Sequence, residues 1–301
     1  MESGSSSHVQ QVQNPLNPLG LPQIVSIGKS FIVTGNVMDF NENLLKLWYD
    51  RMVDFESLKA NDFDVEELFI NQGWKRYFDM LNGPIFTKMV KEFWMKSKVY
   101  DDLSARVEKE QIVLKDPSLK GKSREEMGLK AYNGTEIRSV IAGLDITITK
   151  AHFARLLCLE DRGKKIYDYK SKLHYREVIK KELYGDESLV GKSRTMKDKY
   201  VVLFKIFISS IMSRRGGTDT ISWEHKNFLY FLLKGTKINL LDLIFETLCK
   251  AIRDGNFKRY TTIAYPRLLS ELFFQTNLVT EERAPMLDAG FLTRMSIKKT
   301  L

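Results

Sequence analysis

The chain has 301 residues, of which 43% are apolar and 28% are charged, and its formal net charge is +9. This length suits one large or two small domains, and the apolar fraction is sufficient for a buried core, which excludes a wholly disordered chain. The basic charge would favour nucleic acid or an anionic membrane surface as a partner, but the lysines are spread out, which is also typical of a solvated surface, and we favour that interpretation.

The number of cysteines and the length of the apolar runs indicate the cellular compartment in which we expect the protein. The two cysteines, Cys158 and Cys249, lie in apolar runs, so we predict two small buried side chains in a reducing environment. Residues 1–13 lack the apolar core of a signal peptide. The longest apolar run, 200–212, contains Lys205 and is shorter than the roughly 20 residues of a membrane span. We therefore expect an intracellular protein, cytoplasmic or nuclear, without a signal peptide or membrane span.

The N-terminal part predicts a polar tail followed by short helices. Residues 1–40 are expected to form a flexible tail, because their first half is rich in Ser, Gln, Asn and Pro. A helical period in residues 43–59 predicts a helix there, and residues 65–70 predict a second, short helix that Gly73 ends.

The stretch 74–94 predicts two amphipathic helices. The break between them is Gly83-Pro84, with Pro84 expected at the start of the second helix. The two apolar faces consist of Trp74, Tyr77, Phe78 and Leu81, and of Phe86, Met89, Val90, Phe93 and Trp94. Such an aromatic face could be a ligand platform, but a stripe this wide favours core packing.

The middle of the chain alternates polar and apolar segments. Residues 100–133 are charged and predict a loop or poorly ordered insertion, whereas residues 136–149 alternate β-type residues and predict a hairpin. Thr149 is expected to cap a following helix. A second polar stretch, 161–199, follows; residues 155–199 contain 13 basic and 8 acidic residues, a net charge of +5.

The C-terminal part gives the strongest helical signals. Residues 200–213 predict a buried helix that ends at Arg214 to Gly217. Ser222 and Asn239 are expected to cap the next two helices, and Pro266 to open a last one that runs through Phe274.

The sequence contains partial matches to phosphate-binding, zinc-binding and nucleophile motifs, but each lacks a residue or a spacing that the motif requires. The Gly-Lys-Ser triplets at Gly28, Gly121 and Gly191 lack the earlier glycine of a phosphate-binding loop. The four histidines do not have zinc spacing with the cysteines, and His152 and Cys158 would lie on opposite faces of one helix. We therefore predict no catalytic residues, no metal site and no cofactor, and a protein that is not an enzyme.

Two blocks of the chain carry a family resemblance. They are residues 74–94, with the Gly83-Pro84 break, and residues 204–245; residues 146–157 add to them. These segments resemble the plant transposon protein domain that also occurs in envelope-like proteins of plant gypsy-type retrotransposons, and the similarity runs from about Val65 to about Val279. The resemblance implies an origin in a retroelement, and it brings neither an established activity nor catalytic residues.

Fold and function follow from these patterns as expectations. We predict a mainly α-helical domain of about eight helices and one β-hairpin over residues 41–280, with polar insertions at 100–133 and 161–199, and a C-terminal extension at 281–301. The favoured function is a helical protein-interaction or structural module with a protein partner that the sequence does not name. The alternative is nucleic-acid binding by a basic stretch beside Tyr167, Tyr169 and Tyr175. Its candidate contacts are Arg162, Lys164, Lys165, Lys170, Lys172 and Arg176.

Overall fold

The computed structural model describes most of the chain between residues 45 and 276. The described residues are 25–26, 45–48, 50–141, 144–169, 172–186, 191–212, 219–255, 261–276 and 294–295. Most of the predicted tail, most of the C-terminal extension and the predicted helix end at Arg214 to Gly217 lie outside them.

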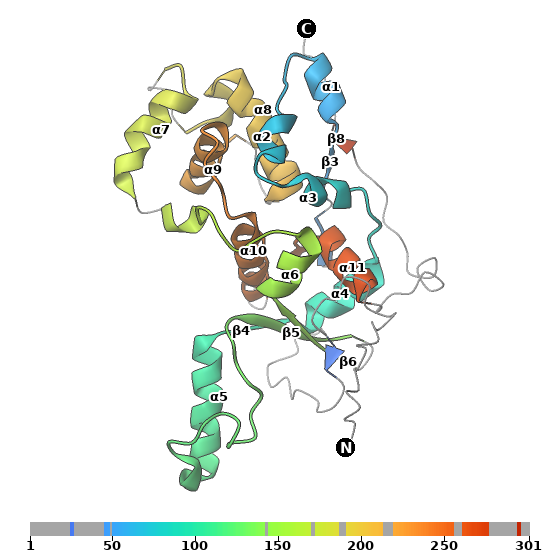
Figure 1. The fold of residues 1–301 in the computed structure, drawn as a ribbon, viewed down its shortest axis with the longest axis vertical. Helices are drawn as coiled ribbons and strands as arrows, with labels where there is room; N and C mark the ends of the chain where they lie inside the picture. The colour runs from blue at the N-terminus through green and yellow to red at the C-terminus, as the bar shows by residue number, and fades with distance from the viewer. Residues whose placement is uncertain are drawn as a thin grey trace, which may run out of the picture.

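The described residues form a mainly α-helical fold, as predicted, with eleven α-helices rather than about eight (Figure 1). The helices are α1 Phe55–Ala60, α2 Glu66–Ile70, α3 Lys75–Met80, α4 Thr87–Lys96, α5 Asp102–Lys115, α6 Lys150–Leu157, α7 Arg176–Leu183, α8 Asp198–Ile206, α9 Trp223–Leu233, α10 Leu240–Gly255 and α11 Pro266–Gln275. Short 3-10 turns cover Pro117–Leu119, Ile166–Tyr169, Leu173–Tyr175 and Ser193–Thr195, and Phe207–Ile211 continues α8 as a π-helical turn.

The strands form one four-stranded sheet and two small parallel pairs. The strands are β1 Val25–Ser26, β2 Leu45–Leu47, β3 Met52–Val53, β4 Lys98–Tyr100, β5 Glu136–Ile141, β6 Leu144–Thr149, β7 Thr261–Ile263 and β8 Arg294–Met295. The larger sheet has the order β1-β6-β5-β4 and is antiparallel, while β2 pairs with β7 and β3 with β8.

The predicted hairpin is confirmed as β5 and β6. Ile137 pairs with Ile148 across it, and both side chains are fully buried. Helix α4 packs on β5, where the Ser139 hydroxyl donates to the Phe93 carbonyl at 2.6 Å. The apolar alternation that predicted the strands therefore also positions the hairpin against the core.

The aromatic stripes at 74–94 belong to the core, as predicted. Trp74 stacks on Phe228 with ring centroids 5.7 Å apart, and Phe93 meets Phe273 edge-on at 5.4 Å. Trp94 is 5% exposed. These contacts join the N-terminal helices to α9 and α11, which places the family-like blocks at the centre of the fold.

Helix caps predicted from the sequence are confirmed. The Ser222 hydroxyl caps α9 and the Asn239 side chain accepts from the amide of Asp242 at 2.9 Å at the start of α10. Thr149 is the N-cap of α6, and Pro266 is the first residue of α11. The Ser222 and Asn239 side chains each accept from an amide of the first helical turn, which has no acceptor within the helix.

The predicted helix at 43–59 is wrong for most of its length. Residues 45–47 and 52–53 are strands, and only α1, from Phe55, is helical. The amide of Trp48 donates to the Ile263 carbonyl at 3.0 Å, and that of Arg51 to Ser209 at 2.9 Å. Long-range backbone pairing of this kind overrides a local helical period.

Three further expectations are corrected. Residues 100–133, predicted as a loop, contain the fourteen-residue helix α5. Helix α4 begins at Thr87, three residues after Pro84. Cys158, predicted to be buried, is exposed, because it ends α6 in the left-handed conformation with φ of 53°. Cys249 is buried as predicted.

Candidate functional site

Helix α5 projects away from the other helices (Figure 1). It begins at Asp101, whose carboxylate accepts from the Ser104 amide at 3.1 Å and pairs with Arg253 of α10 at 2.9 Å. Ala105 is the one buried residue of the helix. Because an isolated helix of this length is marginal in water, contacts outside it must hold it in place.

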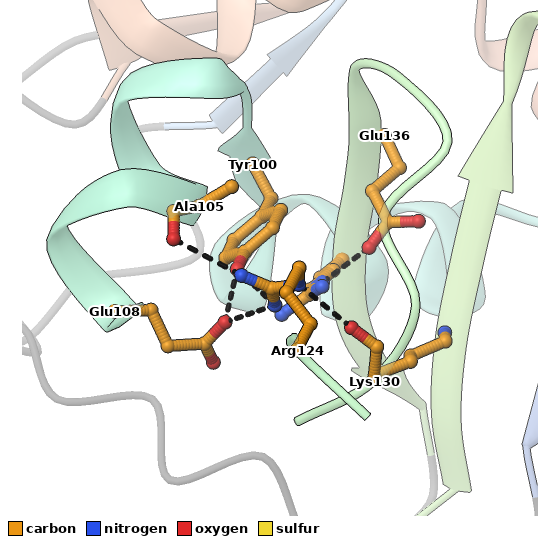
Figure 2. A network of polar contacts seen from close by, with 7 residues as sticks. Tyr100, Ala105, Glu108, Arg124, Lys130 and Glu136 are labelled. Carbon is orange, nitrogen blue, oxygen red and sulfur yellow. Dashed lines mark hydrogen bonds and ion pairs between the residues drawn. The ribbon is translucent and has the colours of Figure 1, made fainter. Parts of the chain in front are cut away.

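A clamp centred on Arg124 provides these contacts (Figure 2). Its guanidinium donates to the carbonyls of Ala105 and Lys130, both at 3.0 Å. It also donates to the Tyr100 hydroxyl at 2.9 Å and to Glu108 at 2.6 Å, and the Tyr100 hydroxyl in turn donates to Glu108. The Arg124 side chain thus joins α5, the segment around Lys130 that leads from α5 back to the sheet, and the end of β4.

Arg138 of β5 completes the clamp on the sheet side. Its guanidinium carbon lies 3.4 Å from the centroid of the Tyr100 ring, and its Nε donates to Glu136 at 2.6 Å. Cation–π contacts and charge-assisted bonds of this kind are stronger than neutral ones. Strand β5 and helix α5 are therefore held together through the Tyr100 side chain at the end of β4.

The charges of the clamp follow from its surroundings. Burial, with Glu108 as acceptor, raises the pKa of Tyr100. Burial acts in the same direction on Glu108, but the hydrogen bonds from Tyr100 and Arg124 outweigh it and hold the pKa of that carboxyl below its ordinary value. At neutral pH the clamp is thus a neutral tyrosine between a carboxylate and two guanidinium groups.

The outward face of α5 carries an apolar stripe, which we define as Leu103, Val107 and Leu114. Their exposed fractions are 60%, 41% and 82%. Spacings of four and seven residues place them on one helical face. Single exposed aliphatic residues are normal, but three aligned on a projecting helix are typical of a helix that binds in a groove.

A polar pocket of about 660 Å³ lies between the hairpin and the start of α6. Its Lys130 donates to Thr147 at 3.1 Å, and its His152 accepts from the Thr149 amide at 3.0 Å. Lys150 pairs with Asp242 at 2.8 Å; burial alone would lower the pKa of Lys150, but this pairing and Asp161 raise it. A lysine held in its protonated form is a poor base or nucleophile, so these side chains favour structure over catalysis.

The predicted nucleic-acid contacts are distributed among several partners. Arg162 pairs with Glu160, and Lys165 with Asp242 at 3.6 Å. Lys164 and Lys172 are brought together over the ring of Tyr169, at 5.7 and 4.4 Å, and Arg176 lies over Trp223 at 4.7 Å. Lys170 lies outside the described residues.

The tyrosines of the basic stretch pack into the fold. Tyr169 is 8% exposed and meets Phe231 edge-on at 4.8 Å, and Tyr175 meets the same ring at 6.1 Å. The Tyr167 hydroxyl bonds to Thr247 at 2.9 Å. Stacking on bases needs an open ring face, and the rings of Tyr169 and Tyr167 are committed to structural contacts.

Sequence reasoning missed Lys226 of α9, which lies beside Arg176. The side chain is 4% exposed, and its ammonium lies 4.4 Å from the Trp223 ring. Burial, then the charges of Lys180 and Arg176, lower the pKa of Lys226. In the described part of the chain no carboxylate pairs with it. In the sequence it resembles any solvated lysine; only Trp223 three residues earlier marks it.

Within the described ranges, no group of three His, Cys, Asp or Glu side chains is placed to hold a metal ion. Over the same ranges, none of the helices combines the length and the apolar character needed to cross a membrane. Comparisons with protein-family models, curated proteins and solved structures find no match to this chain.

Proposed function

We propose that this chain is a non-enzymatic protein-interaction module of retroelement origin, and that α5 is the element that contacts the partner. The observation that carries this proposal is the apolar stripe on a helix that the Arg124 clamp holds in one orientation. Full burial of an aliphatic side chain stabilises a complex by roughly 1.5–3 kcal/mol. Because α5 is already ordered, less of that gain is spent on ordering the helix when it binds.

The origin in a retroelement rests on the resemblance of residues 74–94 and 204–245 to the plant transposon protein domain. Those residues build the core, whereas α5 lies between the two blocks along the chain. A core that carries a projecting element allows binding to be placed outside the core, on a segment that packs little against it.

Photo-crosslinking from Gln111 tests the proposal, because this exposed residue borders the stripe. In an extract of plant cells we expect one discrete protein adduct. Replacing the three stripe residues with serine should abolish it, while the matched control, serine at the exposed Leu173 and Val178, should keep it. The absence of any protein adduct, or an adduct that survives removal of the stripe, would refute the proposal.

Nucleic-acid binding is the second candidate function, and Lys226 is the observation that favours it. This buried ammonium beside Arg176 and the Trp223 ring has no anion next to it among the described residues, and a phosphate group would supply one. Binding of a single-stranded oligonucleotide should then weaken steeply with salt. The pair of changes Arg176→Gln and Lys226→Met should flatten the logarithmic slope by about 0.7 for each phosphate that is no longer neutralised. An unchanged slope, or no binding at low salt, would exclude this candidate.

A further inference from the structure

A small apolar pocket lies between α1, α2 and α3, and we refer to it as the α1–α3 pocket. Its volume is about 310 Å³, and its apolar lining is Met52, Val53, Phe55, Phe69, Ile70 and Phe78. Ile70 is 40% exposed. The pocket is of the size that accepts one or two aliphatic side chains rather than a whole helix face, and its lining also includes the charged side chains Glu66, Lys75 and Asp79 of α2 and α3.

The elements that line this pocket lie in the half of the molecule away from α5, which carries the stripe. Figure 1 places α1 at one end of the longest axis and α5 at the other. An apolar projection at one end and an apolar pocket at the other cannot meet within one chain. They can meet between two copies that follow one another along that axis.

The two ends also differ in charge. Residues 54–79, which carry α1 to α3, contain seven acidic and three basic residues, a net charge of −4. Two of those basic side chains are already paired, Lys59 with Asp64 at 3.3 Å and Lys75 with Asp79 at 3.2 Å. The distal part of the α5 end, residues 109–122, contains four lysines and two acidic residues, a net charge of +2. The distal part of α5 and the turn after it are thus basic where residues 54–79 are acidic, although residues 101–130 as a whole contain seven basic and seven acidic residues. This local difference in charge favours a head-to-tail approach.

We propose that α5 of one copy docks in the α1–α3 pocket of a second copy of this chain, with Leu114 as the inserted side chain. Leu114 is the most exposed residue of the stripe and lies in the last turn of the helix. Such a contact joins two different surfaces, so a pair of copies keeps one free pocket on the first copy and one free helix on the second, and the assembly grows as a row or closes as a ring. The proposal rests on the proposed function, because it names the partner of α5.

Sedimentation velocity of purified protein over a wide concentration range is the primary test. Wild-type protein should grow past the dimer, because a row has no natural end. Two variants remove one surface each: Leu114→Ser on the helix, and Ile70→Ser with Glu66→Lys at the pocket. The control Val178→Ser changes an exposed side chain elsewhere. Each variant is first shown to keep the wild-type circular dichroism and thermal midpoint, so that a failure to assemble reports docking.

Each variant alone should stay monomeric, whereas the control should assemble like wild type. A mixture of the two should form a heterodimer and nothing larger, because the first variant keeps its pocket and the second keeps its helix. Assembly of the pocket variant as far as wild type would show that the α1–α3 pocket is not the docking site of α5, and would overturn the proposal. Wild-type protein that remains monomeric throughout would also overturn it. A Gln111 adduct to a different protein would then leave the proposed function standing, whereas no adduct at all would remove both.

Discussion

Replacing Arg124 with methionine should release α5 while the rest of the fold stays intact. Methionine keeps an unbranched side chain but removes all four donated hydrogen bonds, two of which go to the backbone carbonyls of Ala105 and Lys130. Removing one partner of a buried ion pair costs about 3–5 kcal/mol. Glu108, however, is 35% exposed and regains water when Arg124 is removed, so we expect about 2–3 kcal/mol.

That destabilisation should be local. Ala105 is the one buried residue of α5, so the helix can open without exposing the core, and its opening free energy is set mainly by the clamp. At about 1.36 kcal/mol per factor of ten, amide hydrogen exchange in α5 should accelerate by roughly 30- to 150-fold. Strands β5 and β6 should exchange as in wild type.

Hydrogen exchange read by mass spectrometry separates these regions. The control is Arg106→Met, which removes an exposed arginine from the same helix. Exchange in α5 that changes no more than in this control would show that Arg124 does not hold the helix. Equal acceleration in α5 and in the hairpin would show that the change destabilises the whole fold and that the clamp is not local.

Acid should open the same element. The folded-state pKa of Glu108 lies below its ordinary value, so its contribution to stability is present above the unfolded pKa of about 4.3 and is lost as pH falls through the folded pKa. The pKa of Asp101 at the start of α5 is lowered as well, because the hydrogen bonds from Ser104 and Arg253 outweigh its burial. Protection of α5, corrected for the intrinsic exchange rate, should therefore fall below about pH 4. Glu108→Gln should weaken this dependence; an unchanged profile would contradict the assignment.

Three further predictions concern the body of the fold. Gly163→Ala should lower the free energy of unfolding in urea by at least about 1–3 kcal/mol, because φ of Gly163 is +111° and the added Cβ would lie 2.9 Å from the carbonyl carbon of Ile238. An unchanged urea midpoint would contradict this prediction. One thiol per folded chain should react with a thiol reagent at neutral pH, because Cys158 is exposed whereas burial raises the pKa of Cys249 to about 12. Both thiols should react in denaturant. Rapid labelling of both thiols in the folded protein would contradict this prediction. Trp94→Ala should destabilise the fold by about 3–5 kcal/mol, and a destabilisation under about 0.5 kcal/mol would place that ring outside the core.

Sequence patterns located the elements whose local and tertiary preferences agree. Ser222, Asn239 and Pro266 each precede or begin a helix whose apolar face meets the core, and all three helices begin where predicted. The hairpin was predicted for the same reason. Its strands carry the β-type residues of the local pattern, and Ile137 and Ile148 of the two strands pair with each other. Where several independent signals coincide, the fold can be predicted from the chain.

The two largest failures, at residues 43–59 and 100–133, share one cause, which is that residues outside the segment decide its structure. The segment Leu45–Leu47 is a strand because β7 lies beside it, and no local pattern reveals that pairing. Helix α5 has few buried residues, so its period is weak, and its stability comes from Arg124, which follows the helix in the chain. The N-cap Asp101 and the aligned Leu103, Val107 and Leu114 were the available signals, but a charged segment of low apolar content concealed them.

In the basic stretch 162–176 the local pattern was clear, but the fold does not place its basic and aromatic side chains on one open surface. Interleaved lysines and tyrosines suggest a stacking surface, but Tyr169 is drawn into the core by Phe231 and the lysines lie over its ring. Lys226, which no pattern marked, is a buried cation that no carboxylate pairs with among the described residues. Charge counts along a chain therefore say little about which cations remain available for a ligand.

The clamp and the stripe together support our proposal that α5 is an interaction element rather than part of a surface loop. A helix that buries a single residue adds little to the core, yet Arg124, Glu108 and Tyr100 hold it through a network of charge-assisted bonds. Fixing those side chains costs conformational entropy, and the core gains almost nothing from it. What the clamp does provide is a fixed direction for Leu114, which our proposal that this side chain enters a small pocket requires. A flexible loop carrying the same three aliphatic residues would incur the ordering cost at each binding event, whereas the clamped helix meets that cost once, on folding.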